Sequence, residues 1–78
     1  MKKSEFTKKM EAIGLLIQNY RHIRKYTLKM LAQLTGISGR YLHSVENGRA
    51  NVTMFVLYRI FRVLRIPERE LHNALAGF

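Results

Sequence analysis

Hydrogen-bonding side chains recur at helical spacing between residues 39 and 47. Arg40, His43, Ser44 and Asn47 carry these side chains, and Gly39 shares their spacing. Leu42 and Val45 lie three apart between them, so on an α-helix they would point inward while the polar group points outward. Guanidinium, imidazole, hydroxyl and amide groups are suited to bonding base edges and phosphates. The segment therefore predicts an outward helical face that contacts nucleic acid.

Two short helices are needed to position that face. Thr27 is a good N-cap for a helix that carries Leu28, Leu31, Ala32 and Leu34 and closes at Gly36, which can adopt the left-handed conformation. Ser38 can cap a second helix, and Asn47-Gly48 ends it as a turn signal. Two helices joined by residues 35–38 form a helix-turn-helix, in which the second helix is presented across the surface.

The remaining helices supply the support. A helix is expected from about Thr7 to about Arg24, with Met10, Ile13, Ile17 and Tyr20 on its apolar side. Another should begin after Thr53 and run to Ile66, with the stripe Leu57, Ile60, Phe61 and Leu64, before Pro67. A short fifth helix should span residues 68 to about 76. No segment alternates with a period of two, so we predict an all-α, compact five-helix domain over residues 7–78, after a flexible N-terminal arm of residues 1–6.

Composition and charge narrow the range of possible functions. Fourteen Lys and Arg against five Asp and Glu give a net charge of +9, which suits a polyanion because each neutralised phosphate releases counterions. A merely soluble surface with excess charge is the alternative. The chain has no cysteine, and its apolar runs fall far short of the roughly 20 residues that span a bilayer. We expect a cytoplasmic protein without a membrane contact.

Three strings of residues carry a family resemblance. They are Leu31-Ala32-x-x-Thr35-Gly36-Ile37-Ser38, Tyr41-Leu42-x-x-Val45-Glu46-Asn47-Gly48-Arg49, and Thr53-x-x-x-Leu57-x-x-Ile60-x-x-x-Leu64-x-Ile66. Together they resemble the lambda-repressor/Cro-like (XRE, Cro/C1-type) helix-turn-helix family of transcriptional regulators, over about Ile13 to Leu71. The resemblance implies a five-helix domain that acts as a two-fold homodimer on a partly palindromic operator in double-stranded DNA.

The resemblance also implies site residues. Those at base-reading positions are Ser38, Gly39, Arg40, His43 and Ser44, and Arg40 is the main candidate because a guanidinium can bond guanine O6 and N7 together. Those at phosphate positions are Lys29, Tyr41, Asn47, Gly48, Arg49 and Asn51. Arg21 and Glu46 match a family ion pair that ties the first helix to the end of the recognition helix. Arg40 and His43 could instead be solvated side chains, and Tyr41 could pack its ring over the turn.

This chain departs from the family at several positions. Leu28 stands where a DNA-contacting Gln is frequent, so a phosphate contact from that helix terminus must come from backbone N–H groups or Lys29. Lys25 and Arg65 stand where Gly is usual, Phe61 where a small residue is common, and Val52 where Pro is common. The loss of Gln puts the conventional operator contacts in question.

A second surface is indicated on the fourth helix. Phe55, Tyr58 and Arg62 recur on a side turned away from its apolar stripe, and exposed aromatics suggest an interface. With Leu75 and Phe78 they could build a dimer or partner contact, or they could be covered by the fifth helix.

Other functions find no support in the sequence. It holds no phosphate-cradling Gly-rich loop, nucleophile elbow, HExxH motif or paired carboxylates, so we expect no enzyme, cofactor or small-molecule ligand. His22, His43 and His72 are too far apart for a metal site. The hypothesis is a sequence-specific repressor. A restriction–modification controller, a DNA-binding antitoxin with a toxin partner, and a protein-interaction module on the same fold are the alternatives.

Overall fold

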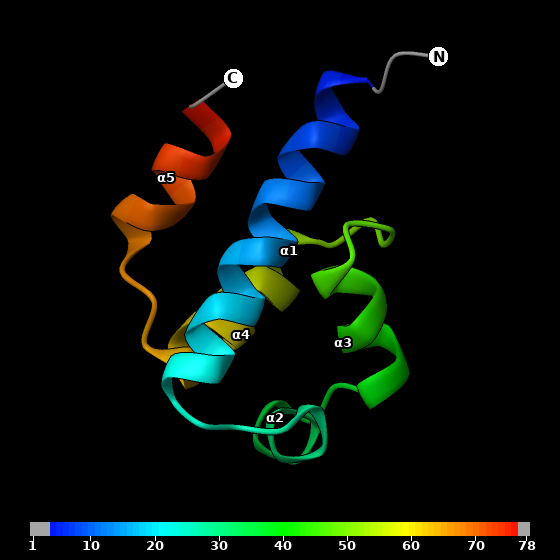
Figure 1. The fold of residues 1–78 in the computed structure, drawn as a ribbon, viewed down its shortest axis with the longest axis vertical. Coiled ribbons are helices and arrows are strands. Elements are labelled where there is room, and N and C mark those ends of the chain that lie inside the picture. Colours follow the sequence, from blue (N-terminus) through cyan, green and yellow to red (C-terminus); the bar gives the residue numbers. More distant parts are fainter. Residues whose placement is uncertain (1–3, 77–78) are drawn as a thin grey trace.

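Five helices and no strand make up residues 4–76, the part of the chain that the computed structural model describes. They are α1 (Glu5–Ile23), α2 (Leu28–Thr35), α3 (Gly39–Glu46), α4 (Met54–Leu64) and α5 (Glu68–Ala76). In Figure 1 the long helix α1 crosses in front of α4, with α3 on one side and α5 on the other, and α2 is seen end-on beneath them. The all-α, five-helix prediction is confirmed.

Hydroxyl side chains begin four of the helices. The side-chain oxygens of Ser4, Thr27, Ser38 and Thr53 each accept the backbone N–H three residues on, at 3.0–3.2 Å. Such a cap stabilises a helix by about 1 kcal/mol because it satisfies an N–H that has no partner within the helix. Ser4 was not predicted, and α1 starts earlier than expected: Glu5 and Phe6, assigned to the arm, lie within the helix.

The end of α4 differs from the prediction. The helix ends at Leu64, and not at Ile66, because Arg65 adopts a left-handed conformation with φ 57°. Arg24, the C-cap residue of α1, donates from Nε to Leu64 O at 2.8 Å and from Nη2 to Arg65 O at 3.2 Å, which satisfies carbonyls that α4 leaves open. Ile66 then turns into the core and is 6% exposed.

The core is formed by α1, α2, α3 and α4 together with Ile66, which follows α4. Its buried apolar residues are Ile13, Ile17, Leu31, Leu42, Val45, Leu57, Ile60, Phe61, Leu64 and Ile66. Leu42 and Val45 are among them, so α3 buries the side that its spacing predicted. No described residue of α5 is fully buried. Lys9 Nζ, which donates to Leu75 O, links α5 to α1.

The length and polarity of a helix decide whether it could cross a membrane. Over the described residues, none of the helices is long and apolar enough to cross a bilayer.

Candidate nucleic-acid interface

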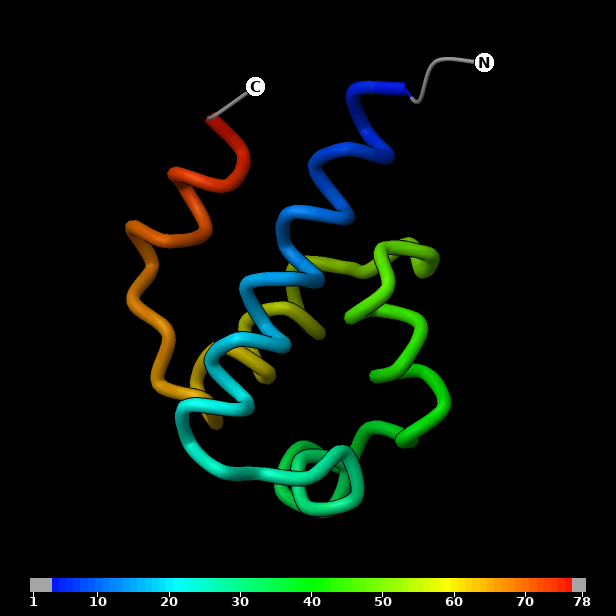
Figure 2. The backbone as a smooth tube through the Cα atoms, viewed as in Figure 1, coloured from blue at the N-terminus to red at the C-terminus, as the bar shows by residue number. Residues whose placement is uncertain are grey.

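The turn between α2 and α3 changes the chain direction within three residues. Gly36 has φ 73° and its N–H caps Ala32 O at 2.8 Å, as a left-handed residue at a helix end does. Thr35, 4% exposed, donates from Oγ1 to Leu31 O at 2.7 Å and accepts the N–H of Ile37 at 3.2 Å. Figure 2 shows α2 nearly end-on and α3 from the side, so the two helix axes run in different directions. The predicted helix-turn-helix is present.

An arginine of α4 fastens this turn from outside. Arg59 Nη1 donates to Thr35 O at 3.1 Å, at the last residue of α2. A cation at a helix C-terminus also interacts favourably with the helix dipole. The sequence did not indicate this bond, because only the tertiary fold brings α4 to the end of α2.

A buried ion pair fixes the far end of α3 to α1. Arg21 donates from Nε to Glu46 Oε2 at 2.7 Å and from Nη2 to Glu46 Oε1 at 3.1 Å, and Nη1 donates to Tyr26 O at 2.8 Å. The two side chains are 11% and 3% exposed. A planar guanidinium that meets a carboxylate with two parallel bonds holds its orientation as well as its distance. The pair therefore sets where α3 ends relative to α1.

Two glycines let α1 approach α3 and the loop after it. A Cβ at Gly14 would lie 2.4 Å from Val45 O and 2.6 Å from Glu46 O. Gly48, at φ 70°, faces Glu11 so closely that a Cβ there would lie 2.8 Å from the Glu11 Cα. Backbone therefore packs directly on backbone at both places. Gly14 had no signal in the sequence beyond being a glycine inside a helical pattern.

The outward face of α3 is open to a ligand. Arg40 and His43 are exposed, while Gly39 and Ser44 are partly buried. Arg40 forms no hydrogen bond, ion pair or ring contact with any described residue. A Cβ at Gly39 would meet nothing within 4 Å. The oxygen of Ser38 is occupied by the cap of α3, but its hydroxyl proton remains free to donate.

The end of α3 uses most of the donors predicted for phosphate. The backbone N–H groups of Asn47, Gly48 and Arg49 donate to His43 O, Val45 O and Ser44 O at 3.1, 3.0 and 2.9 Å. Asn47 Nδ2 also donates to His43 O at 2.8 Å and lies 3.3 Å from His43 Nε2. The backbone N–H of Gly48 is therefore not free to bind a phosphate. Glycine suits this position because φ is positive and because Glu11 lies too close for a Cβ.

The side chains of the four other predicted phosphate residues differ in which donors they have free. The Tyr41 hydroxyl donates to Asn51 O at 3.0 Å, and its partly buried ring packs against the core. This bond leaves Tyr41 no proton to donate to a phosphate while it is made. Arg49 and Lys29 are exposed, and the side chain of Asn51 is also exposed. Arg49 and Lys29 are thus the strongest phosphate donors of the predicted set.

Some of the basic charge serves the fold. Arg21 bonds a carboxylate and a carbonyl, and Arg24 and Arg59 bond carbonyls at helix ends. Glu46 neutralises the charge of Arg21, whereas Arg24 and Arg59 keep their charge but commit some of their donors to carbonyls, so the net charge of +9 overstates the donors that are free for a ligand. On α3 and in the loop that follows it, Arg40 and Arg49 are exposed and have no carboxylate partner among the described residues.

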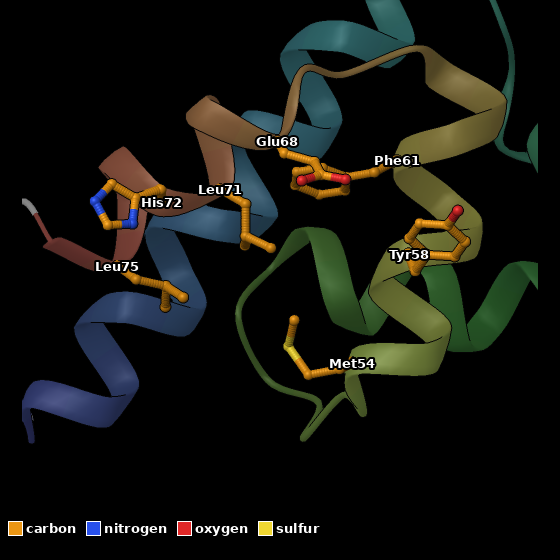
Figure 3. A pocket seen from close by; sticks show the side chains of 7 residues that line it. All are labelled: Met54, Tyr58, Phe61, Glu68, Leu71, His72 and Leu75. Atoms are coloured by element: carbon orange, nitrogen blue, oxygen red, sulfur yellow. The ribbon is translucent and has the colours of Figure 1, made fainter.

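Exposed apolar groups line the space between α4 and α5. The residues lining this α4–α5 groove are Met54, Tyr58, Phe61, Glu68, Leu71, His72 and Leu75, around a volume of about 370 Å³. Figure 3 shows them projecting from both helices. Phe55 and Tyr58 are 67% and 54% exposed, so α5 does not cover them. Phe55 and Arg62 lie outside the groove, and Phe78 lies outside the described residues.

Comparisons with known proteins agree with this geometry. A family model described as helix-turn-helix matches residues 17–71. The chain belongs to the lambda-repressor-like (XRE) helix-turn-helix family. The crystal structure of the restriction–modification controller protein C.AhdI from Aeromonas hydrophila is similar to this member of the family, with a TM-score of 0.74 and 27% identity, over 80% of this chain and 94% of that one. No curated protein sequence matches the chain.

Members of the XRE family are DNA-binding transcriptional regulators. The outward face of α3 is therefore the candidate DNA-binding surface. Within the helix-turn-helix, α2 and the turn brace α3, and α1 and α4 hold the brace through Arg21, Gly14 and Arg59. Sequence reasoning missed Arg59 and Arg24 because an exposed arginine and a helix-capping arginine look alike in a sequence.

Proposed function

We propose that this helix-turn-helix protein is a sequence-specific double-stranded DNA-binding transcriptional repressor that acts in the cytoplasm as a homodimer. The observation that carries the proposal is Arg40, exposed and without a partner among the described residues, on a helix whose other side is fixed. Leu42 and Val45 anchor that side in the core, and Glu46 is held by Arg21. A rigid helix with a free guanidinium at its start is what reading a base in the major groove requires.

The base-reading group centres on the first two turns of α3. Arg40 would bond guanine O6 and N7 together, and Ser38 and Ser44 would supply hydroxyls beside it. Gly39 leaves open space where the helix comes closest to the base edges. His43 is exposed one turn after Arg40, but it shares its ring nitrogen with Asn47. Its role is therefore coupled to the position of that amide.

Phosphate contacts would fix the register. Arg49 follows the end of α3 and Lys29 lies in the first turn of α2, and both side chains are exposed. The exposed side chain of Asn51 can add a neutral donor. Asn47 would donate the Nδ2 proton that is not bonded to His43 O. Such contacts position the protein on DNA and make its affinity fall with salt, without reading sequence.

The α4–α5 groove is the surface we assign to the homodimer. Met54 is 63% exposed and Leu75 36% exposed, and Leu71 also lines the groove. A two-fold interface places the same patch of each copy against its mate, which would bury these apolar groups twice. One α3 would then meet each half of a palindromic operator, and an occupied operator would exclude other DNA-binding proteins.

A restriction–modification controller is the second candidate function. The structural likeness to C.AhdI extends over 94% of that controller chain and favours this version over an antitoxin. A controller would use the same face of α3, so the site argument is unchanged between the two.

The test is a selection of bound duplexes from a randomised pool at near-physiological salt. It should be run on the wild-type chain, on Arg40→Ala, and on Arg69→Ala as a matched loss of one exposed charge on α5. We expect the wild type and Arg69→Ala to select one palindrome, and Arg40→Ala to lose information at one position in each half. Unrelated sequences from all three chains would contradict the proposal.

A further inference from the structure

The outer side of α4 carries a second arrangement of exposed groups. We call Phe55, Tyr58, Arg59, Arg62 and Val63 the α4 outer strip; together they line a shallow depression of about 340 Å³. The strip lies opposite the buried side of the helix. At three- and four-residue spacing, Phe55, Arg59 and Arg62 share a face that the core residues Leu57 and Ile60 do not.

Each aromatic ring of the strip holds a guanidinium. The Arg59 Cζ lies 5.0 Å from the Phe55 ring centroid, and the Arg62 Cζ lies 5.7 Å from that of Tyr58. Arg62 Nη1 also donates to Tyr58 Oη at 3.1 Å, and this hydrogen bond raises the pKa of Arg62 above its ordinary value. The rings and cations are thus arranged before any partner arrives, so ordering them on binding would cost little.

No carboxylate of the described chain neutralises these cations. The ion pairs found between residues 4 and 76 join Lys9 to Glu5 and Arg21 to Glu46, both away from the strip. Exposed aromatics and arginines without lysine or acidic residues are the composition that protein interfaces favour. The strip therefore presents positive charge that no carboxylate of the described residues neutralises, beside exposed apolar area.

We propose that the α4 outer strip binds an acidic segment of a second protein, one that places carboxylates on either side of an apolar side chain. The carboxylates would meet Arg59 and Arg62, and the apolar group would cover Phe55 and Val63. Arg–carboxylate pairs are bidentate and can form while the guanidinium stays stacked on a ring. This surface is separate from α3 and does not depend on whether α3 binds DNA.

Charge argues against the two other occupants. A second copy placed two-fold on the same strip would bring arginines against arginines, because an isologous interface is self-complementary. Duplex DNA would satisfy the cations through phosphate but offers no apolar group for Phe55, which is 67% exposed. An acidic protein segment satisfies both parts of the strip.

The test uses a synthetic probe. A helical peptide of roughly 16 residues, about four turns, is built from Glu, Leu and Ala with Glu on either side of Leu, and a matched peptide carries Gln in place of Glu. Each is titrated into the uniformly ¹⁵N-labelled full chain, and shifts of backbone amides locate the contact. We expect the acidic peptide to move amides of residues 55–63 and the Gln peptide to bind at least about tenfold more weakly.

Variants separate the strip from overall charge. Arg62→Glu and Arg69→Glu change the net charge equally, and both side chains are exposed, so the fold should tolerate either. We expect Arg62→Glu to weaken the acidic peptide about tenfold or more and Arg69→Glu to change it less than about twofold. Phe55→Ser should weaken binding without altering net charge.

Three results would overturn the proposal. Equal loss in Arg62→Glu and Arg69→Glu would show attraction to charge alone, and shifts at α3 would place the peptide on the DNA-binding face. Shifts at Phe55, Arg59 and Arg62, which lie outside the α4–α5 groove, would assign the strip to a second copy if they follow protein concentration, and to nucleic acid if duplex DNA reproduces them. None of these results would bear on base reading by Arg40, which the duplex selection tests by itself.

Discussion

Arg21 in α1 and Glu46 at the end of α3 meet through two parallel hydrogen bonds, at 2.7 and 3.1 Å, in a place that excludes most water. The pair joins residues 25 positions apart and holds the helix that carries Arg40. Its value lies in orientation as much as in stability, because a buried ion pair recovers little more than the cost of removing its charges from water.

Breaking this pair from one side should be costly. Glu46→Gln leaves Arg21 charged and short of a carboxylate, so we expect a loss of about 3 kcal/mol in the free energy of unfolding, measured by urea denaturation. Glu5→Gln, which breaks the ion pair with Lys9 in which the Glu5 side chain is 69% exposed, is the control and should change stability by less than about 1 kcal/mol. Equal stability of Glu46→Gln and the wild type would show that the pair is not formed in solution.

Glycine at Lys25 should stabilise the chain. Lys25 has φ 61°, a conformation that costs an L-residue roughly 1 kcal/mol and that glycine adopts freely. Because the side chain is exposed, Lys25→Gly should raise the free energy of unfolding by about 0.5 kcal/mol after the entropy of glycine is subtracted. Gly36→Ala, at φ 73°, is the opposite change and should destabilise by about 1 kcal/mol. A loss of stability in Lys25→Gly would place this residue outside the left-handed region.

Two helical glycines should respond differently to the same change. Gly14→Ala forces a Cβ against the carbonyls of Val45 and Glu46, so α1 and α3 must separate; we expect a loss of about 2–3 kcal/mol and weaker DNA binding. Gly39→Ala meets open space and adds helix propensity, so stability should hold or rise by up to about 1 kcal/mol. Thermal unfolding of both variants decides the matter. Tolerance of alanine at residue 14 would mean that the two helices do not touch there.

Arg49 should act on DNA without reading it. Its exposed guanidinium follows α3, and its backbone N–H is already bonded to Ser44 O. Removal of a phosphate contact weakens binding on all sequences alike and lowers the slope of log affinity against log salt by about one. Arg49→Ala should therefore bind selected and random duplexes more weakly by the same factor. A loss confined to the selected duplex would make Arg49 a base reader instead.

Much of the fold could be predicted from the sequence, because local rules govern it. Thr27, Ser38 and Thr53 are caps, Gly36 is a left-handed terminus, and the inward side of α3 follows from its spacing. What could not be predicted depends on tertiary neighbours. The end of α4 at Leu64 depends on Arg24 reaching its carbonyls, and Gly14 is required only because α3 lies against it.

The candidate site, like the fold, could be predicted only where local rules determine it. The outward polar face of α3 follows from helical periodicity, whereas the hydrogen bonds that occupy Tyr41 and the N–H of Gly48 follow from packing. Spacing shows which residues share a face, but it does not show which of their donors the chain has already used. The assignment of bases to Ser38, Gly39, Arg40, His43 and Ser44 stays a prediction.

The most direct test of the central claim is a double-mutant cycle between Arg40 and its guanine. Affinities of the wild type and Arg40→Ala are measured by fluorescence anisotropy at near-physiological salt, on the selected palindrome and on a duplex with that guanine replaced in both halves. If Arg40 reads the guanine, the variant should lose about 1–3 kcal/mol on the palindrome and little on the altered duplex. Equal losses on both duplexes would show that Arg40 contributes charge alone and would contradict the account.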